Sequence, residues 1–249
     1  SNSISTNRYI NDLNVPIRLG TSFIDQEKNR IYVYELNDVP GGMATISSMN
    51  LDSLKWKIHS YKQLPQQRHH HNGFFNQEAQ TFMIFGGFGN QKFSNEFNVY
   101  DIETDSWELS SFTGDKISPR FFSGSTLRDG NEILIFGGTG NESGDQTLGK
   151  TYYYDLHSID LNKNSIRKIR NYESREIDNV SVRNMIMADD GESFYTLCYP
   201  EYIPNSHLKL YQFSLNDGKY RILGDSLPIV SEKIESNANL YSNKSTNEI

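Results

Sequence analysis

The amino-acid sequence repeats itself with a period of about 50 residues, and this period constrains the fold more than any other feature. Four apolar or aromatic residues are each followed, seven positions later, by another, with a polar turn between the two. The pairs are Met49 and Trp56, Tyr100 and Trp107, Ile159 and Ile166, and Phe213 and Tyr220. Such a period is typical of a fold in which one small unit is stacked several times.

Each repeat predicts four antiparallel strands. An apolar run of β-branched and aromatic residues precedes every pair, as expected for a strand buried on both faces. These runs lie at 31–34, 82–85, 133–136 and 194–197. Asp-Gly dipeptides at 129–130 and 190–191 are typical of the tight turns that join such strands. A four-stranded unit with two apolar faces does not fold alone, and radial stacking buries both faces.

Glycine pairs end the apolar run in the second and third repeats, at 86–87 and 137–138. In the second repeat the pair is followed by Tyr100 and, seven residues later, by Trp107. This pattern resembles the kelch repeat of galactose-oxidase-like β-propellers. The motif is specific in two of the four repeats, because Glu35-Leu36 and Cys198-Tyr199 replace the glycines in the first and fourth. The resemblance implies an all-β propeller of four-stranded antiparallel kelch-type blades.

The repeat boundaries predict a single propeller domain over 1–249, with four complete blades and partial blades at both ends. The complete blades are expected at 14–62, 63–113, 114–172 and 178–225, and the partial blade at 226–249 together with 3–13. Because both ends lie within a blade, we expect the chain to be a fragment of a longer protein.

Composition excludes several classes of function. A net charge of −7 over 249 residues argues against a nucleic-acid partner, which requires clustered Lys and Arg. No apolar run approaches the roughly 18 residues that span a bilayer, so we expect no membrane insertion by this segment. The single cysteine, Cys198, excludes an internal disulfide and a paired-cysteine zinc site. We expect no cofactor. The compartment stays open, with a preference for an extracytoplasmic one, and so does the oligomeric state.

Strand direction predicts where a binding site lies. If strands a to d alternate in direction, the loops that join b to c emerge on one face, here called the b–c loop face. These loops are expected at 37–45, 88–94, 139–151 and 200–207. An arginine precedes the first strand of each blade on the same side, so we expect a ring of arginines at the mouth of the channel. Its members are Arg18, Arg68, Arg120 and Arg183.

Two interpretations of these arginines are open. Each can hydrogen-bond backbone carbonyls of its own or the neighbouring blade, as the kelch resemblance implies. The planar guanidinium also suits a ligand carboxylate, which makes all four candidate ligand-binding residues.

Three further residues complete the predicted binding site. His71 lies in a run of three histidines, but neighbours along a strand point to opposite faces and no third ligand is evident, so we expect no metal. Tyr199 and Tyr202 are candidates for stacking on a sugar ring, with core packing as the alternative. Nothing around Cys198 indicates the copper site of galactose oxidase.

Two functions are consistent with this pattern. The first is a non-catalytic recognition module that binds a protein or a glycan on the b–c loop face, and one form of this hypothesis makes it the sensor part of a longer protein. The alternative is a sugar-processing enzyme resembling kelch-type sialic-acid mutarotases. No nucleophile elbow, phosphate loop or paired-carboxylate motif is present, so catalysis lacks positive support.

Overall fold

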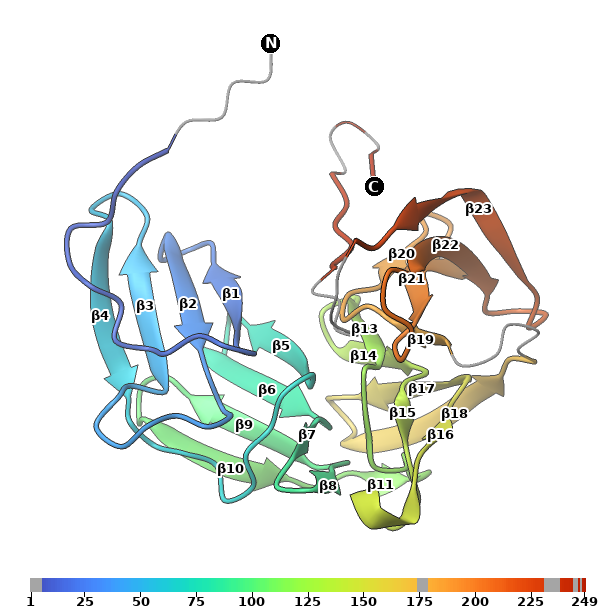
Figure 1. Ribbon diagram of the computed structural model, residues 1–249, viewed down its shortest axis with the longest axis horizontal. Helices are drawn as coiled ribbons and strands as arrows, with labels where there is room; N and C mark the ends of the chain where they lie inside the picture. Colours follow the sequence, from blue (N-terminus) through green and yellow to red (C-terminus); the bar gives the residue numbers. More distant parts are fainter. Residues whose placement is uncertain (1–5, 174–178, 231–237, 244–245, 247) are drawn as a thin grey trace. The chain divides into compact units, whose positions relative to one another are not determined.

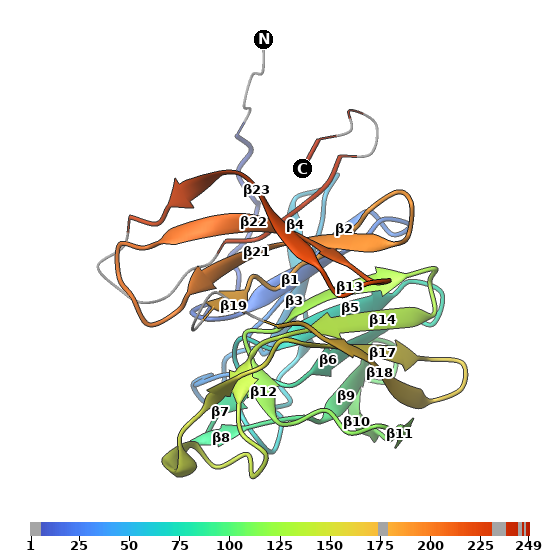
Figure 2. The ribbon, with the colours of Figure 1, turned by 90° about the vertical axis from the view of Figure 1, so that its right-hand side faces the viewer.

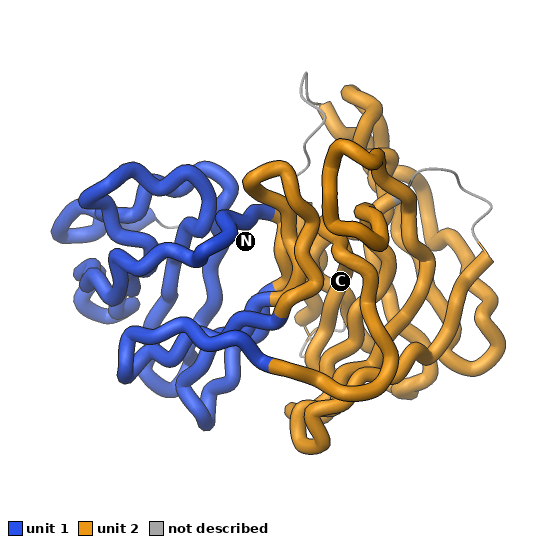
Figure 3. Tube along the Cα trace, turned by 90° about the horizontal axis from the view of Figure 1, so that it is seen from below, with its two compact units in different colours: residues 1–69, 73–84, 97–110 blue, residues 70–72, 85–96, 111–249 orange. Residues whose placement is uncertain are grey.

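The structure is a computed structural model that describes residues 6–173, 179–230, 238–243, 246 and 248–249. Its regular elements in these ranges are β-strands and one short 3₁₀ helix, η1 (Gln146–Leu148). The chain divides into two compact units, shown in different colours in Figure 3. Unit 1 comprises 1–69, 73–84 and 97–110, and unit 2 comprises 70–72, 85–96 and 111–249.

Unit 1 is built around two four-stranded antiparallel sheets, whose strands follow one another across each sheet in chain order (Figure 1). Blade 1 consists of β1 (Thr21–Asp25), β2 (Arg30–Tyr34), β3 (Ile46–Asn50) and β4 (Lys55–Ser60). Blade 2 consists of β5 (Asn72–Asn76), β6 (Thr81–Phe85), β9 (Phe97–Asp101) and β10 (Ser106–Ser110).

Unit 2 contains two more sheets with the same strand order (Figure 2). Blade 3 consists of β13 (Gly124–Arg128), β14 (Glu132–Phe136), β17 (Asp155–Asp160) and β18 (Ser165–Asn171), with β11 (Thr113–Gly114) parallel to β18 at the outer edge. Blade 4 consists of β21 (Ser193–Pro200), β22 (His207–Ser214) and β23 (Tyr220–Pro228), and β19 (Asn179–Ser181) and β20 (Ile186–Met187) share its inner position. The predicted kelch-type propeller blades are therefore confirmed.

Two smaller sheets lie in unit 2 beside the blade sheets, formed from b–c loops and from the segment that leads into blade 3. The first is the hairpin of β7 (Phe88–Gly89) and β8 (Lys92–Phe93). In the second, β15 (Thr139–Gly140) lies between β12 (Arg120–Phe121) and β16 (Thr151–Tyr152).

The spacing of seven positions within each pair matches the register of the two outer strands in every blade. Both members of each predicted pair are direct cross-strand partners, from Met49 with Trp56 to Phe213 with Tyr220. The residue after the first member caps the turn, since its side chain accepts hydrogen bonds from two amides of the turn. These capping residues are Asn50, Asp101, Asp160 and Ser214. The sequence pattern thus reflects a local turn that recurs four times.

The core of each unit lies between its own blades. In unit 1, Tyr34 and Ile46 of blade 1 pack in one cluster with Ile84 and Tyr100 of blade 2. Trp107 packs against this cluster, with its ring centroid 5.1 Å from that of Tyr100. In unit 2, aromatic rings join blades 3 and 4. They belong to Phe136, Tyr172, Phe194 and Phe213.

The two ends of the chain carry no named strand in the parts that the structure describes. Near the N-terminus, Ile10 donates a backbone hydrogen bond to Leu54, and the side chain of Asn11 bonds to both the N–H and the C=O of Trp56. Residues 3–5 and 231–237 of the predicted partial blade lie outside the described residues. The partial blade, like the predicted blade boundaries, stays a prediction. No described helix is long and apolar enough to cross a bilayer.

Candidate functional site

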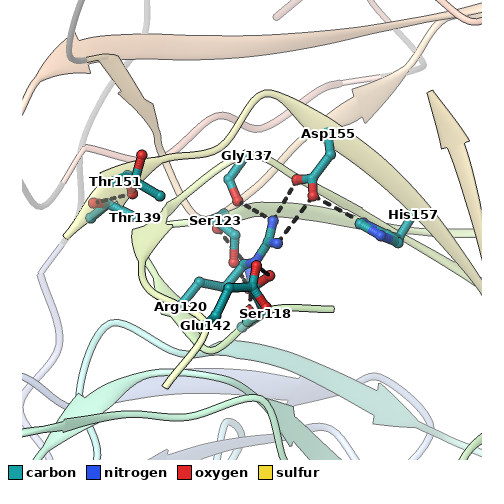
Figure 4. A network of polar contacts seen from close by, with 10 residues as sticks. Ser118, Arg120, Ser123, Gly137, Thr139, Glu142, Thr151, Asp155 and His157 are labelled. Atoms are coloured by element: carbon teal, nitrogen blue, oxygen red, sulfur yellow. Dashed lines mark hydrogen bonds and ion pairs between the residues drawn. The ribbon is translucent and has the colours of Figure 1, made fainter. Parts of the chain in front are cut away.

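Arg120 holds the b–c loop of blade 3 in place from within the protein. It is 0% exposed, and its Nε donates to the carbonyl of Ser118 at 2.9 Å. One terminal nitrogen donates to the carbonyl of Gly137 at 2.9 Å and to Asp155 at 2.5 Å, while the other reaches Asp155 at 3.1 Å (Figure 4). The guanidinium also lies 4.1 Å from the centroid of the Tyr153 ring. These contacts match the interpretation of the arginine as a structural side chain.

Burial and the charge of Arg120 together set the protonation of Asp155 and His157. Burial alone would raise the pKa of Asp155, but the hydrogen bonds and positive charge of Arg120 outweigh it and lower that pKa below its usual value. His157 lies beside the carboxylate, with Nδ1 3.8 Å from Asp155 Oδ2. Burial lowers the pKa of His157 to about 4, against the opposing effect of Asp155. At neutral pH the group is therefore an ion pair next to an uncharged imidazole.

The other predicted arginines have different surroundings. Arg18 is exposed, Arg68 is buried and Arg183 is half-buried. Arg18 and Arg68 belong to unit 1, whereas Arg120 and Arg183 belong to unit 2, so the ring of four stays a prediction. Within unit 2 the backbone carbonyl of Arg183 accepts a hydrogen bond from Ser125.

The three remaining predicted residues lie in unit 2. His71 and Tyr199 are buried, whereas Tyr202 is 43% exposed. Tyr199 packs edge-on against Phe122, with the ring centroids 6.4 Å apart. The assignment of these residues to a ligand stays a prediction, and Tyr202 alone among the three is exposed.

The b–c loop face of unit 2 carries a cluster of aromatic rings that sequence reasoning did not identify. We call it the aromatic platform, and it consists of Phe88, Phe93, Phe121, Phe122 and Tyr152. Phe121 is at its centre, with ring centroids 5.5 Å from both Phe88 and Phe93 and 4.6 Å from Phe122. Phe93 is buried and the other four side chains are half-buried.

The small sheet explains why two of these rings, those of Phe121 and Tyr152, face the same way. Phe121 is paired with Thr139, and Thr139 in turn with Tyr152. Directly paired residues in an antiparallel sheet share one face, so the side chains of Phe121 and Tyr152 lie on the same side. Arg120 is on the opposite side, because neighbours along a strand alternate.

Two residues at the platform, Phe122 and His70, have a backbone conformation with positive φ. Phe122 has a φ of 56° and His70 a φ of 51°, which is unusual for bulky residues. Each stands two residues after the arginine of its repeat. Their rings lie 4.3 Å apart between centroids, and Phe122 donates a backbone hydrogen bond to His70. Such a conformation costs about 1–3 kcal/mol per residue, and it is concentrated at functional sites in proteins.

A cation and a carboxylate stand at the edge of the platform. The ammonium of Lys150 is ion-paired with Glu201 and lies 5.9 Å from the centroid of Phe121 and 5.7 Å from that of Tyr152. The hydroxyl of Tyr152 donates to the same carboxylate at 2.8 Å. Glu201 is only 7% exposed. The ion pair joins the b–c loop of blade 3 to that of blade 4.

The signal that could have revealed this site was weak. The aromatic pair at 121–122 follows the arginine of its repeat, and Glu201 lies between the candidate residues Tyr199 and Tyr202. Neither Lys150 nor Tyr152 has a distinguishing local pattern. Among the described residues, no group of three or more His, Cys, Asp or Glu side chains is placed to hold a metal ion.

The fold and the repeat together define a kelch-type β-propeller protein. The family model of the KLHDC2/KLHL20/DRC7 Kelch-repeats domain matches residues 28–224, and the chain belongs to this family. Kelch-repeat domains are generally protein-interaction modules.

Two relatives share part of the sequence. Host cell factor 2 of Homo sapiens is 37% identical over 75 residues, which is 30% of this chain and 9% of the relative. The Rab9 effector protein with kelch motifs of Bos taurus is 23% identical over 138 residues, or 55% of this chain and 36% of the relative. The matches thus span a minor part of both relatives.

Proposed function

We propose that the chain is a non-catalytic recognition module and that the b–c loop face of unit 2 is the surface on which it binds a protein partner. The observation that carries the proposal is the aromatic platform, a cluster of rings of which four are half-buried. Aromatic residues dominate the binding energy of protein interfaces, because they bury a large area with few rotatable bonds.

Exposed apolar side chains extend the surface beyond the platform. Leu148 on η1 is 72% exposed, and Tyr202 and Ile203 in the b–c loop of blade 4 are 43% and 44% exposed. The two loops are joined by the ion pair of Lys150 and Glu201. A patch of this kind on a rigid scaffold is typical of a protein-binding site.

The rigidity of the scaffold also supports the proposal. Arg120 fixes the loop of blade 3 from the buried side through its bonds to Ser118, Gly137 and Asp155. A loop that is already ordered loses little conformational entropy when it binds, which favours affinity. In this proposal Arg120 positions the surface and does not contact the partner.

Quantitative affinity capture with three forms of the chain tests the proposal. The forms are the wild type, the double variant Leu148→Ser, Tyr202→Ala and the control Leu127→Ser. Leu127 is 42% exposed and lies on β13, near the turn at the opposite end of blade 3. We expect a set of proteins that the wild type and the control retain and the double variant loses. Equal retention by all three forms would overturn the proposal.

A thermal-shift panel of acidic and neutral sugars separates a protein partner from a glycan. We expect no change in Tm with any sugar. A rise in Tm that the double variant abolishes would mean that the same surface binds a carbohydrate.

A further inference from the structure

We propose that Phe121, Tyr152 and Glu201 form a cage for a positively charged side chain of the partner, an arginine above all, and that Lys150 occupies this cage in the free protein. The inference rests on the proposed function, since it assumes that the b–c loop face of unit 2 binds a protein. It adds the chemistry of the partner and a competition between the partner and the chain's own lysine.

The cage is complete without Lys150. Its walls are the rings of Phe121 and Tyr152, which share one face of the small sheet. Its base is the carboxylate of Glu201, oriented by the Tyr152 hydroxyl at 2.8 Å. Two aromatic faces and one carboxylate around a single position are a set of groups that binds cations.

A cation is required at this position because Glu201 is almost fully buried. Leaving a buried carboxylate without a counter-charge is costly, whereas exchanging one cation for another keeps the pair intact. The Lys150 side chain is 35% exposed, so it can be displaced toward solvent. Displacement by a partner's cation therefore costs much less than emptying the cage.

The chemistry of the cage favours arginine over lysine. Arginine presents a flat, weakly hydrated guanidinium that stacks on aromatic faces and binds a carboxylate through two parallel hydrogen bonds. Lysine supplies a compact and strongly hydrated charge. A partner's arginine is thus a stronger occupant than Lys150.

The surrounding charge also suits a basic partner. Glu142 and Asp145 are exposed on the same loop as Lys150, and the chain as a whole carries a net charge of −7. The backbone of Lys92 forms an isolated antiparallel β-bridge with that of Asp145, and the positive charge of Lys92 helps to lower the pKa of Asp145. Complementary charge raises the rate of association and selects against acidic partners.

The test titrates the whole chain with two small probes, N-acetyl-arginine amide and the uncharged N-acetyl-norleucine amide. Binding of each probe is measured by ¹H–¹⁵N NMR. In Lys150→Ala we expect the arginine probe to bind about tenfold more tightly than in the wild type, a gain equivalent to one cation–π and ion-pair contact. Amide shifts should be centred on Phe121 and Tyr152. The norleucine probe should bind neither form.

Two further variants keep the inference falsifiable. Adding Glu201→Gln to Lys150→Ala should abolish the tighter binding while the NMR spectrum remains that of a folded chain. Lys163→Ala, which removes an exposed lysine paired with Asp160 at the c–d turn of blade 3, should leave affinity unchanged. Equal affinity of Lys150→Ala and the wild type for arginine would overturn the cage, and so would equal binding of norleucine.

The capture experiment distinguishes failure of the cage from failure of the binding surface. If the double variant Leu148→Ser, Tyr202→Ala loses its partners but Lys150→Ala gains no affinity for arginine, the surface stands and the cage is wrong. If Lys150→Ala binds arginine more tightly but no protein depends on the surface, the cage has a cationic ligand other than a protein.

Discussion

After the second strand, blades 1 and 3 hydrogen-bond their backbone with side chains of opposite charge. In blade 3 the second strand is followed by Gly137-Gly138, and the carbonyl of Gly137 accepts a hydrogen bond from the buried Arg120 side chain. In blade 1 the same two positions are Glu35 and Leu36. The Glu35 carboxylate accepts four backbone hydrogen bonds, two from Arg18 and Leu19 and two from Leu36 and Asn37.

The difference shows that both blades need hydrogen-bond partners for the backbone at this turn, and that different residues can supply them. A chain that turns sharply at the end of a buried strand leaves backbone polar groups away from water, and these groups need partners. In blade 3 the Arg120 side chain donates to a backbone carbonyl, and Asp155 balances its charge. In blade 1 the Glu35 carboxylate accepts from backbone N–H groups, and the Arg18 side chain is exposed.

The largest expected effect is the loss of the Arg120 side chain. Arg120→Met would leave Asp155 buried without its counter-charge and should lower the free energy of unfolding by about 3–5 kcal/mol. Arg18→Ala, at the matching position of blade 1, should change it by less than about 0.5 kcal/mol because its side chain is exposed. Urea denaturation measures both. Similar costs for the two variants would show that the arginines have equivalent roles.

Removing the carboxylate of blade 1 should have the next largest effect. Glu35→Ala leaves four backbone N–H groups without their acceptor and should cost about 2–3 kcal/mol in the free energy of unfolding. The control is Glu27→Ala, an exposed carboxylate in the turn between β1 and β2, which we expect to be nearly neutral. A cost no greater than that of the control would mean that water replaces the Glu35 carboxylate without loss of stability.

Acid should weaken blade 3 through His157. Burial lowers the pKa of His157 to about 4 in the folded chain, whereas in the unfolded chain it titrates near its usual 6.5. Between these values the unfolded chain binds more protons, so stability is complete above pH 6.5 and falls as the pH drops toward 4, by an amount on the order of 2 kcal/mol. His157→Phe should flatten this part of the curve.

Blade 1 contains a second histidine that sharpens the same measurement. Burial, followed by Lys57 and Arg30, lowers the pKa of His59 to about 4 as well. His157→Phe should therefore reduce the acid sensitivity without removing it, and adding His59→Phe should reduce it further. An unchanged pH profile in both variants would contradict the assignment.

The smallest expected effect concerns the glycine pair. Gly138 has a φ of 95°, and a Cβ atom there would lie 2.8 Å from the carbonyl oxygen of Phe121. Gly138→Ala should cost about 2 kcal/mol, part of it from the left-handed conformation and the rest from this contact. Gly130→Ala, where φ is 72° and no atom lies within 4 Å of the added Cβ, should show the conformational cost alone, about 1 kcal/mol. Equal costs would mean that the contact relaxes freely.

Much of the fold was predictable because its signals are local. The seven-residue spacing predicted the polar turn that joins β3 to β4 and the matching strands in the other blades, since a six-residue connection admits few geometries. The b–c loops were also predicted where they occur. The platform was not, because whether Phe121 or Tyr152 is in the core or half-exposed depends on packing among distant loops.

The sequence by itself determined the repeat, the kelch-type blades and the polar turns between their outer strands, because each of these depends on neighbours within one unit. Only the tertiary structure decided that Arg68 and Arg120 are buried whereas Arg18 is exposed, and which aromatic residues reach the surface. Arg120 meets Asp155 across 35 positions and Lys150 meets Glu201 across 51. Such partners are chosen by how loops and blades pack, and the local pattern around each of these residues carries no record of that choice.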